Sequence, residues 1–161
     1  MSIANLRVLA DRRYLPLVLL LGLAVVLTAI AAASAVEGES AWLAPEAAQR
    51  ASAGGEIVLV DVRSPREWRE TGLPEHARPI TIHDPAGIEG FGEKVLAAVD
   101  GDRERPIALI CARGYRSARA RDYLASIGFT RLLDVREGML GRDGAPGWLE
   151  RGLPLRSCAN C

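Results

Sequence analysis

A single cysteine followed by two arginines is the pattern in this sequence that points most clearly to chemistry. Cys111 ends a short apolar run, and Arg113 and Arg116 come within the next five residues. The thiolate is the nucleophilic form of cysteine, and neighbouring positive charge favours it over the thiol. The same charge attracts an anionic substrate. We therefore expect Cys111 to act as a nucleophile on an anion, rather than to serve only as a small buried hydrophobic residue.

The segments on either side of Cys111 predict a strand before it and a helix after it. Residues 106–110, PIALI, form an apolar run that is too short for a helix and typical of a buried strand. A helix is expected over residues 117–127, with Gly128 ending it. Free backbone N–H groups and the dipole at the start of that helix both stabilise an anion. The loop of residues 111–116 is thus expected to hold a thiolate and to bind an oxyanion.

Short apolar strands alternate with helices along the rest of the sequence. The expected strands are residues 57–62 (IVLVDV), 78–82 (RPITI), 106–110 and 131–135 (RLLDV). The expected helices are residues 44–56, a helix that begins at Pro65, 87–100, 117–127 and a closing turn of helix at 148–152. Each strand is apolar on both faces, which predicts an α/β fold with a parallel sheet covered by helices on both faces. Cys111 then ends a central strand, at the sheet edge where such folds bind ligands.

Charged residues follow the first expected strand and mark the start of a helix. Ser64 suits the N-cap, Pro65 the first helical position and Glu67 the third, an arrangement close to a capping box. Asp61 and Arg63 come just before it. We expect these two residues to have a structural role, paired with each other or with backbone near the cysteine loop.

Three segments of the sequence resemble the single-domain rhodanese (sulfurtransferase) family. They are LVDVRSPREW (59–68), PIALICARGYRSARARDYLASIGFTRLLDVREGM (106–139) and GWLERGLPL (147–155), and the similarity runs from about Ala44 to Leu155. The resemblance implies a parallel sheet flanked by helices and the transfer of a sulfane sulfur through a cysteine persulfide, a role that falls to Cys111. It also implies a substrate-binding loop made of Ala112, Arg113, Gly114, Tyr115, Arg116 and Ser117.

Two segments depart from the pattern of this family. Relatives usually have Gly-His-Ile-Pro-Gly-Ala before the second strand, where this sequence has GLPEHA at residues 72–77. The segment GRDGAPG is inserted after Met139 and lengthens a loop that could border the active site. This insertion either shapes the access of a sulfur acceptor or is plain surface.

The resemblance implies a small anionic sulfur donor and a thiol or cyanide acceptor, with thiosulfate favoured because two arginines suit a dianion. Cysteine phosphatases are disfavoured, because their loop holds one residue more than the four between Cys111 and Arg116, and no aspartate acid is evident in it. A non-enzymatic persulfide carrier, or a sulfur-binding partner of another exported protein, is the main alternative. No cofactor is expected, and His76 and His83 have no neighbour at the spacing of metal ligands.

The first 36 residues differ in composition from the rest. Arginines precede an uncharged apolar run, Tyr14 to Val36, and glutamates follow it, which places the remainder of the chain outside the cytoplasm. The run is either a signal peptide cleaved after Ala33-Ser34-Ala35 or an uncleaved anchor long enough to cross ~30 Å of hydrocarbon. We therefore expect a signal peptide or transmembrane anchor at 1–36, a rhodanese domain at 37–156, and a periplasmic or extracytoplasmic location, secreted or tethered to the membrane.

Two more cysteines, Cys158 and Cys161, lie in the C-terminal tail at 157–161. A C-x-x-C pair suggests a redox dithiol or half of a zinc site, but no second pair completes a metal site. In an exported protein a disulfide is the simplest expectation. A sharper hypothesis is that these accessory thiols accept sulfur from Cys111 or resolve its oxidised form. Basic and acidic side chains balance at 20 each, so there is no bulk attraction to nucleic acid.

Overall fold

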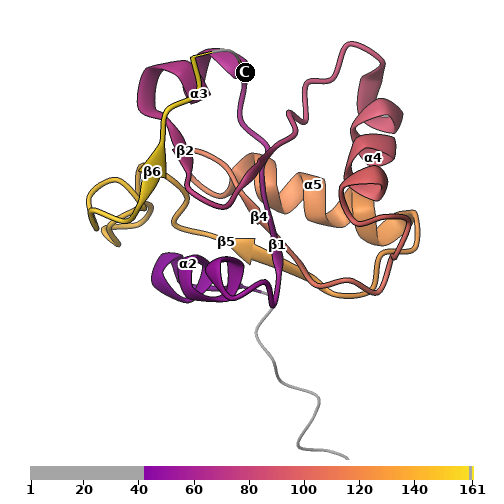
Figure 1. Cartoon of the computed structure of the whole chain (residues 1–161), viewed down its shortest axis with the longest axis horizontal. Helices are drawn as coiled ribbons and strands as arrows, with labels where there is room; N and C mark the ends of the chain where they lie inside the picture. Colours follow the sequence, from indigo (N-terminus) through magenta and orange to yellow (C-terminus); the bar gives the residue numbers. More distant parts are fainter. Residues whose placement is uncertain (1–41, 160) are drawn as a thin grey trace, which may run out of the picture. The chain divides into compact units, whose positions relative to one another are not determined.

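A four-stranded parallel sheet is the framework of the residues that the computed structural model describes, 42–159 and 161. Its strands are β1 (Val58–Asp61), β3 (Arg78–Pro79), β4 (Ile107–Ile110) and β5 (Leu132–Val135), in the order β3-β1-β4-β5. Figure 1 labels β1, β4 and β5. Asp61 lies opposite Ile110, which in turn lies opposite Val135. All four strands therefore end at one edge of the sheet, and β4 delivers Cys111 to the middle of that edge.

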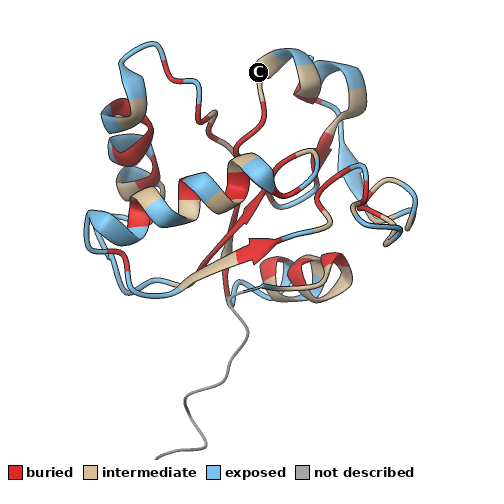
Figure 2. Ribbon diagram, turned by 180° about the vertical axis from the view of Figure 1, so that it is seen from behind, coloured by how far each residue is buried: buried red, intermediate tan, exposed pale blue. Residues whose placement is uncertain are grey.

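Helices cover both faces of the sheet, as the sequence predicts. Helices α4 (Gly87–Ala98) and α5 (Tyr115–Ser126) pack on one face, and α2 (Pro45–Ala53) packs on the other (Figure 2). Neighbouring residues of β4 point to opposite faces: Leu109 belongs to the core beneath α4 and α5, and Ala108 to the core beneath α2. All four residues of β4 are buried, as expected of a central parallel strand.

Helix α3 (Pro65–Thr71) stands at the carboxyl edge of the sheet, and the capping box expected at its start is present. The Glu67 backbone N–H donates to the Ser64 hydroxyl oxygen, and the Ser64 backbone N–H donates to the Glu67 carboxylate at 2.9 Å. A small antiparallel pair follows, formed by β2 (Leu73–Pro74) and β6 (Leu155–Arg156). The sequence does not predict this pair, because its strands are two residues long and the paired residues lie 81 and 83 positions apart.

Three expected elements differ from those observed. The strand expected at 78–82 is reduced to β3, although Ile80 and Ile82 continue to donate backbone hydrogen bonds to β1 and the residue after it. The helix after the cysteine begins at Tyr115, two residues early, because Gly114 adopts a left-handed conformation that starts it at once. Residues 148–152 form hydrogen-bonded turns instead of a helix, and the N–H groups of Trp148 and Leu149 donate to the carbonyl oxygens of Gly138 and Met139.

The N-terminal hydrophobic segment expected at 1–36 lies outside the described residues. Among residues 42–159 and 161, no helix has the length and apolar character needed to span a bilayer.

Candidate active site

The sulfur of Cys111 accepts hydrogen bonds from two donors at the start of α5. The Cys111 side chain is buried, with 2% of its surface exposed. Its Sγ atom accepts a hydrogen bond from the Gly114 backbone N–H at 3.1 Å and another from the Ser117 hydroxyl at 3.4 Å. These donors, with the positive end of the helix dipole, stabilise negative charge on the sulfur.

Two glycines allow the loop to pack closely against the segment that follows β5. Gly114 has φ +81°, and a Cβ atom there would collide with the carbonyl oxygen of Arg136. Gly138 has φ +62°, and a Cβ atom there would lie 2.5 Å from the carbonyl oxygen of Cys111. That carbonyl accepts a hydrogen bond from the N–H of Met139, and the next carbonyl, of Ala112, accepts one from Leu140. The backbone of the loop is thus fixed by the segment after β5.

Arg116 ties the loop to α3 rather than projecting freely into solvent. Its two terminal nitrogens, Nη1 and Nη2, donate to the two carboxylate oxygens of Glu67 at 2.7 and 2.6 Å. This hydrogen bonding is the largest cause that lowers the pKa of Glu67 to about 2, and it raises the pKa of Arg116. Glu67 therefore serves both as the cap of α3 and as the partner that orients the loop, a role that the sequence analysis does not assign to it.

The remaining residues of the loop differ in exposure. Arg113 is exposed, and its Nη1 atom donates to the carbonyl oxygen of Gly141 at 3.1 Å. Tyr115 is 64% exposed, and the guanidinium of Arg142 lies 4.4 Å from the centre of its ring. Ala112 is half-buried. Of the predicted loop residues, the structure thus brings Gly114 and Ser117 into contact with the sulfur, whereas Arg113 and Tyr115 are exposed.

A buried acid behind the loop is a second residue that sequence reasoning missed. Asp134 lies in β5 next to the cysteine strand and is 5% exposed. Burial is the largest cause that raises the pKa of Asp134. Within the described residues, its Oδ1 atom is buried and has no hydrogen-bond partner. The sequence does offer one signal for Asp134. It is an acidic residue near the carboxyl end of a strand, and that strand is next to the one that ends at Cys111.

Comparison with known proteins decides the family. A model of the rhodanese-like domain matches residues 44–141, which contain the sheet, α3 and the whole cysteine loop. The chain belongs to the rhodanese-like domain family.

Individual relatives of this rhodanese-like domain are distant. A sulfurtransferase of Allochromatium vinosum is 26% identical over 113 residues, which span 66% of this chain and 85% of the relative. An uncharacterized protein of Rickettsia prowazekii is 28% identical over 98 residues, 60% of this chain and 80% of the relative. The solved polysulfide-sulfur transferase homodimer of Wolinella succinogenes is 28% identical, with 74% of this chain and 80% of that chain covered and a TM-score of 0.53.

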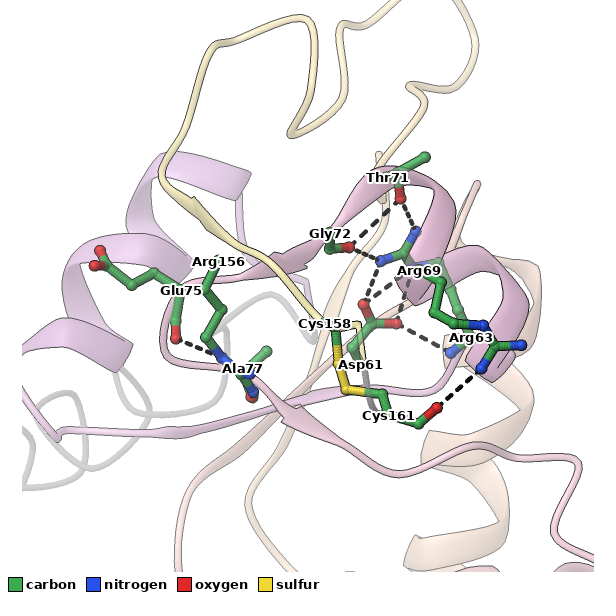
Figure 3. Close-up of a disulfide and its surroundings, with 10 residues drawn as sticks. All are labelled: Asp61, Arg63, Arg69, Thr71, Gly72, Glu75, Ala77, Arg156, Cys158 and Cys161. Atoms are coloured by element: carbon green, nitrogen blue, oxygen red, sulfur yellow. Dashed lines mark hydrogen bonds and ion pairs between the residues drawn. A yellow bond between two sulfur atoms is a disulfide. The ribbon is translucent and has the colours of Figure 1, made fainter.

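The ion pair expected of Asp61 and Arg63 is present and supports the edge of the rhodanese-like domain. The Arg63 guanidinium donates to both carboxylate oxygens of Asp61, at 2.7 to 3.0 Å, and both side chains are buried. It also donates to the Thr71 hydroxyl and to the carbonyl oxygen of Gly72 at the end of α3 (Figure 3). Because every end of this guanidinium is occupied within the fold, the pair is structural.

The C-terminal cysteines form the expected disulfide, packed against α3 beyond the matched family segment (Figure 3). Cys158 is 5% exposed and contacts Trp68 and Leu73 in a small apolar cluster separate from the core that contains Cys111. Arg69 donates to the carbonyl oxygen of Cys161 at 2.9 Å. The tail is therefore held against the outer helix by both apolar and polar contacts.

Proposed function

We propose that this protein is a sulfurtransferase that carries a sulfane sulfur on Cys111, from a small anionic donor to a thiol or cyanide acceptor. Membership of the rhodanese-like family and the sulfurtransferases among its relatives support the reaction class. The observation that carries the proposal is the Cys111 sulfur, which accepts hydrogen bonds from Gly114 and Ser117 at the start of α5.

The reaction has two steps, each a displacement at sulfur. The Cys111 thiolate attacks the outer sulfur of thiosulfate, a new S–S bond forms, and the S–S bond of the donor breaks, with its electron pair leaving on sulfite. An acceptor thiolate then attacks the terminal sulfur of the Cys111 persulfide. The protein S–S bond breaks, its electron pair returns to Cys111 as thiolate, and the acceptor leaves as a persulfide, or as thiocyanate when it is cyanide. The N–H and hydroxyl donors around the sulfur stabilise the anion in both steps.

The two arginines of the loop have different parts in this reaction. Arg113 is exposed and uses one terminal nitrogen within the fold, so its remaining donors are available to an anion. Arg116 has both terminal nitrogens on Glu67, which places its charge near the loop while fixing the loop to α3. Thiosulfate remains the favoured donor, because a bidentate guanidinium matches its oxyanion face.

Intact-protein mass spectrometry tests the first step. The reduced protein, incubated with thiosulfate, should gain the mass of one sulfur atom on the peptide that contains Cys111, and cyanide should remove it as thiocyanate. Cys111→Ser should gain nothing, because a hydroxyl is neither ionised at this site nor a comparable nucleophile for sulfur. Sulfur found on the serine variant, or only on Cys158 or Cys161, would overturn the assignment. Repeated turnover supports an enzyme, whereas a single stoichiometric transfer supports a persulfide carrier.

We also propose that the domain works outside the cytoplasm. The arginines before the apolar run Tyr14 to Val36 and the glutamates after it support this orientation. Protease added to spheroplasts should digest the domain, and a protected domain would contradict the proposal. N-terminal sequencing of the mature chain distinguishes a cleaved signal peptide from a membrane anchor.

A further inference from the structure

A pocket of about 220 Å³ lies directly beside the cysteine loop. Its lining residues are Trp42, Arg136, Glu137, Arg142, Asp143 and Ala145. Sites that enclose a whole drug-sized ligand have volumes of ~300–1,000 Å³, so this pocket suits one end of a small molecule. Most of its wall comes from the segment after β5, including part of the insertion after Met139.

The walls of the pocket and the cysteine loop share contacts. Gly114 of the loop packs against the backbone of Arg136, and the guanidinium of Arg142 covers the ring of Tyr115. Arg113 donates to the carbonyl oxygen of Gly141, next to Arg142. A molecule held in this pocket therefore lies against residues that contact the cysteine loop.

The pocket carries charges of both signs. Arg136 and Arg142 both approach the carboxylate of Asp143, at 3.5 and 3.2 Å, so that one acid serves two guanidinium groups. Within the part of the chain that the structure describes, the Oε2 atom of Glu137 is buried and accepts no hydrogen bond. Buried polar atoms in native proteins almost always have a partner, so this oxygen is open to a donor supplied by water or by a ligand. The Arg136 side chain is 53% exposed and can pair with an incoming carboxylate.

We propose that this pocket binds the zwitterionic end of a low-molecular-weight thiol acceptor. Its ammonium group donates to Glu137, its carboxylate pairs with Arg136 and Arg142, and its thiol extends over Tyr115 to the terminal sulfur of the Cys111 persulfide. The inference rests on the proposed sulfurtransferase function and deepens it by naming the class of acceptor. It concerns the second step alone, in which the acceptor thiolate takes the terminal sulfur and Cys111 regains its electron pair.

Part of the pocket wall lies beyond the segment that the family model matches. The family match ends at residue 141, and a tight hairpin follows it, in which Arg142 and Ala145 exchange backbone hydrogen bonds. Asp143 at its tip has φ +52°, a conformation that few side chains other than Asp and Asn adopt readily. The hairpin places Arg142 over Tyr115. Under the proposal, the insertion after Met139 shapes the access of the sulfur acceptor.

Two acceptors and separate half-reactions test the proposal. The full-length protein is loaded with sulfur from thiosulfate, freed of excess donor, and mixed with glutathione or with 2-mercaptoethanol, a neutral thiol. The loss of sulfur from Cys111 is followed by intact-protein mass spectrometry at several concentrations of each thiol. We expect Glu137→Gln, Arg136→Gln and Arg142→Gln each to lower the ratio of the glutathione rate to the 2-mercaptoethanol rate about tenfold, the effect of one lost charge-assisted interaction.

Matched controls keep the test specific. Glu150→Gln and Arg131→Gln change exposed charges outside the pocket and should leave the ratio unchanged. An unchanged ratio in all three pocket variants, or an equal loss with both thiols, would overturn the acceptor site. A wild-type protein that takes up no sulfur from any donor would instead overturn the proposed function itself. Arg136→Gln retains the backbone carbonyl that contacts Gly114, so it keeps the test valid should the other two variants fold poorly.

Discussion

The cysteine loop after β4 and the cysteine pair after β6 place buried sulfur in two very different surroundings. Cys111 and Cys158 are almost equally inaccessible, at 2% and 5% exposed. The sulfur of Cys111 accepts hydrogen bonds from an N–H group and a hydroxyl at a helix start, whereas Cys158 is bonded to Cys161 and packs on Trp68. The burial of a cysteine therefore does not indicate whether its sulfur is reactive, whereas the hydrogen-bond donors that contact the sulfur do.

The arginines near the cysteines also have different roles in the two regions. Around the tail, Arg69 and Arg156 donate to backbone carbonyls and so fasten a segment in place. In the loop, Arg116 is held by a carboxylate and stands beside a helix start that points at sulfur. An arginine close in sequence to a cysteine therefore supports nucleophilic chemistry only when the fold also places hydrogen-bond donors on the sulfur.

The strongest test of this contrast compares a glycine of the loop with one near the tail. Gly114→Ala should lower the rate of sulfur loading by about 100-fold or more, because its Cβ would collide with the backbone of Arg136 and displace the N–H donor from Cys111. Gly152→Ala also introduces a side chain at positive φ but into open space, so it should cost only about 1 kcal/mol of stability. Mass spectrometry of samples quenched at set times measures the rate of sulfur loading, and urea unfolding measures stability. Equal effects on loading would contradict the role of the Gly114 N–H.

Replacing arginines on α5 gives the next largest effect. Arg116→Lys should lower kcat/KM for sulfur transfer about tenfold, because an ammonium group cannot reproduce the two parallel bonds to Glu67. Arg119→Lys changes an exposed position of the same helix and should stay within about twofold of the wild type. Steady-state kinetics with thiosulfate and cyanide make the comparison. Similar losses in both variants would mean that the Arg116–Glu67 pair does not orient the loop.

Removal of the tail disulfide should affect stability and leave the chemistry intact. The double variant Cys158→Ser with Cys161→Ser should lower the free energy of unfolding by about 1–2 kcal/mol, because the disulfide closes a loop of only a few residues. Loading of Cys111 should remain at the wild-type level, since the tail packs in a separate cluster. Urea unfolding and mass spectrometry provide the two measurements. A variant that folds but fails to load would make the tail part of the active site.

The smallest predicted effect is a pH dependence that belongs to Glu67. Its pKa is lowered to about 2 in the folded protein from an ordinary value of 4.5, so the ionised carboxylate stabilises the fold. That contribution is fully present above about pH 4.5 and is lost as the pH falls from there through about pH 2. Glu67→Gln should flatten the fall in stability across this window, whereas Glu70→Gln, on an exposed part of α3, should not. Urea midpoints measured between pH 5 and pH 2 check the difference.

The sequence predicted those elements that depend on local pattern. Apolar runs such as 107–110 and the polar cap of Ser64 are local signals, and the structure confirms both. The Arg116–Glu67 pair joins residues 49 positions apart, so neither residue alone reveals it. The same holds for the two-residue strands β2 and β6, which have no periodic pattern of their own. The local pattern of residues 148–152 predicts a helix, but it carries no information on the hydrogen bonds that join Trp148 and Leu149 to Gly138 and Met139, ten positions earlier.

The pairing of Glu67 with Arg116 has a consequence for the two halves of the chain. The turn at residues 100–105 is exposed, and in the sequence it lies between Glu67 on α3 and the segment that holds Cys111 and Arg116. The two central strands, β1 and β4, are likewise on opposite sides of that turn. A chain cut there yields one fragment that carries the sulfur and another that carries the group orienting its loop. Sulfur loading would then report fragment complementation, which makes the domain a candidate split reporter whose signal is a covalent mass change.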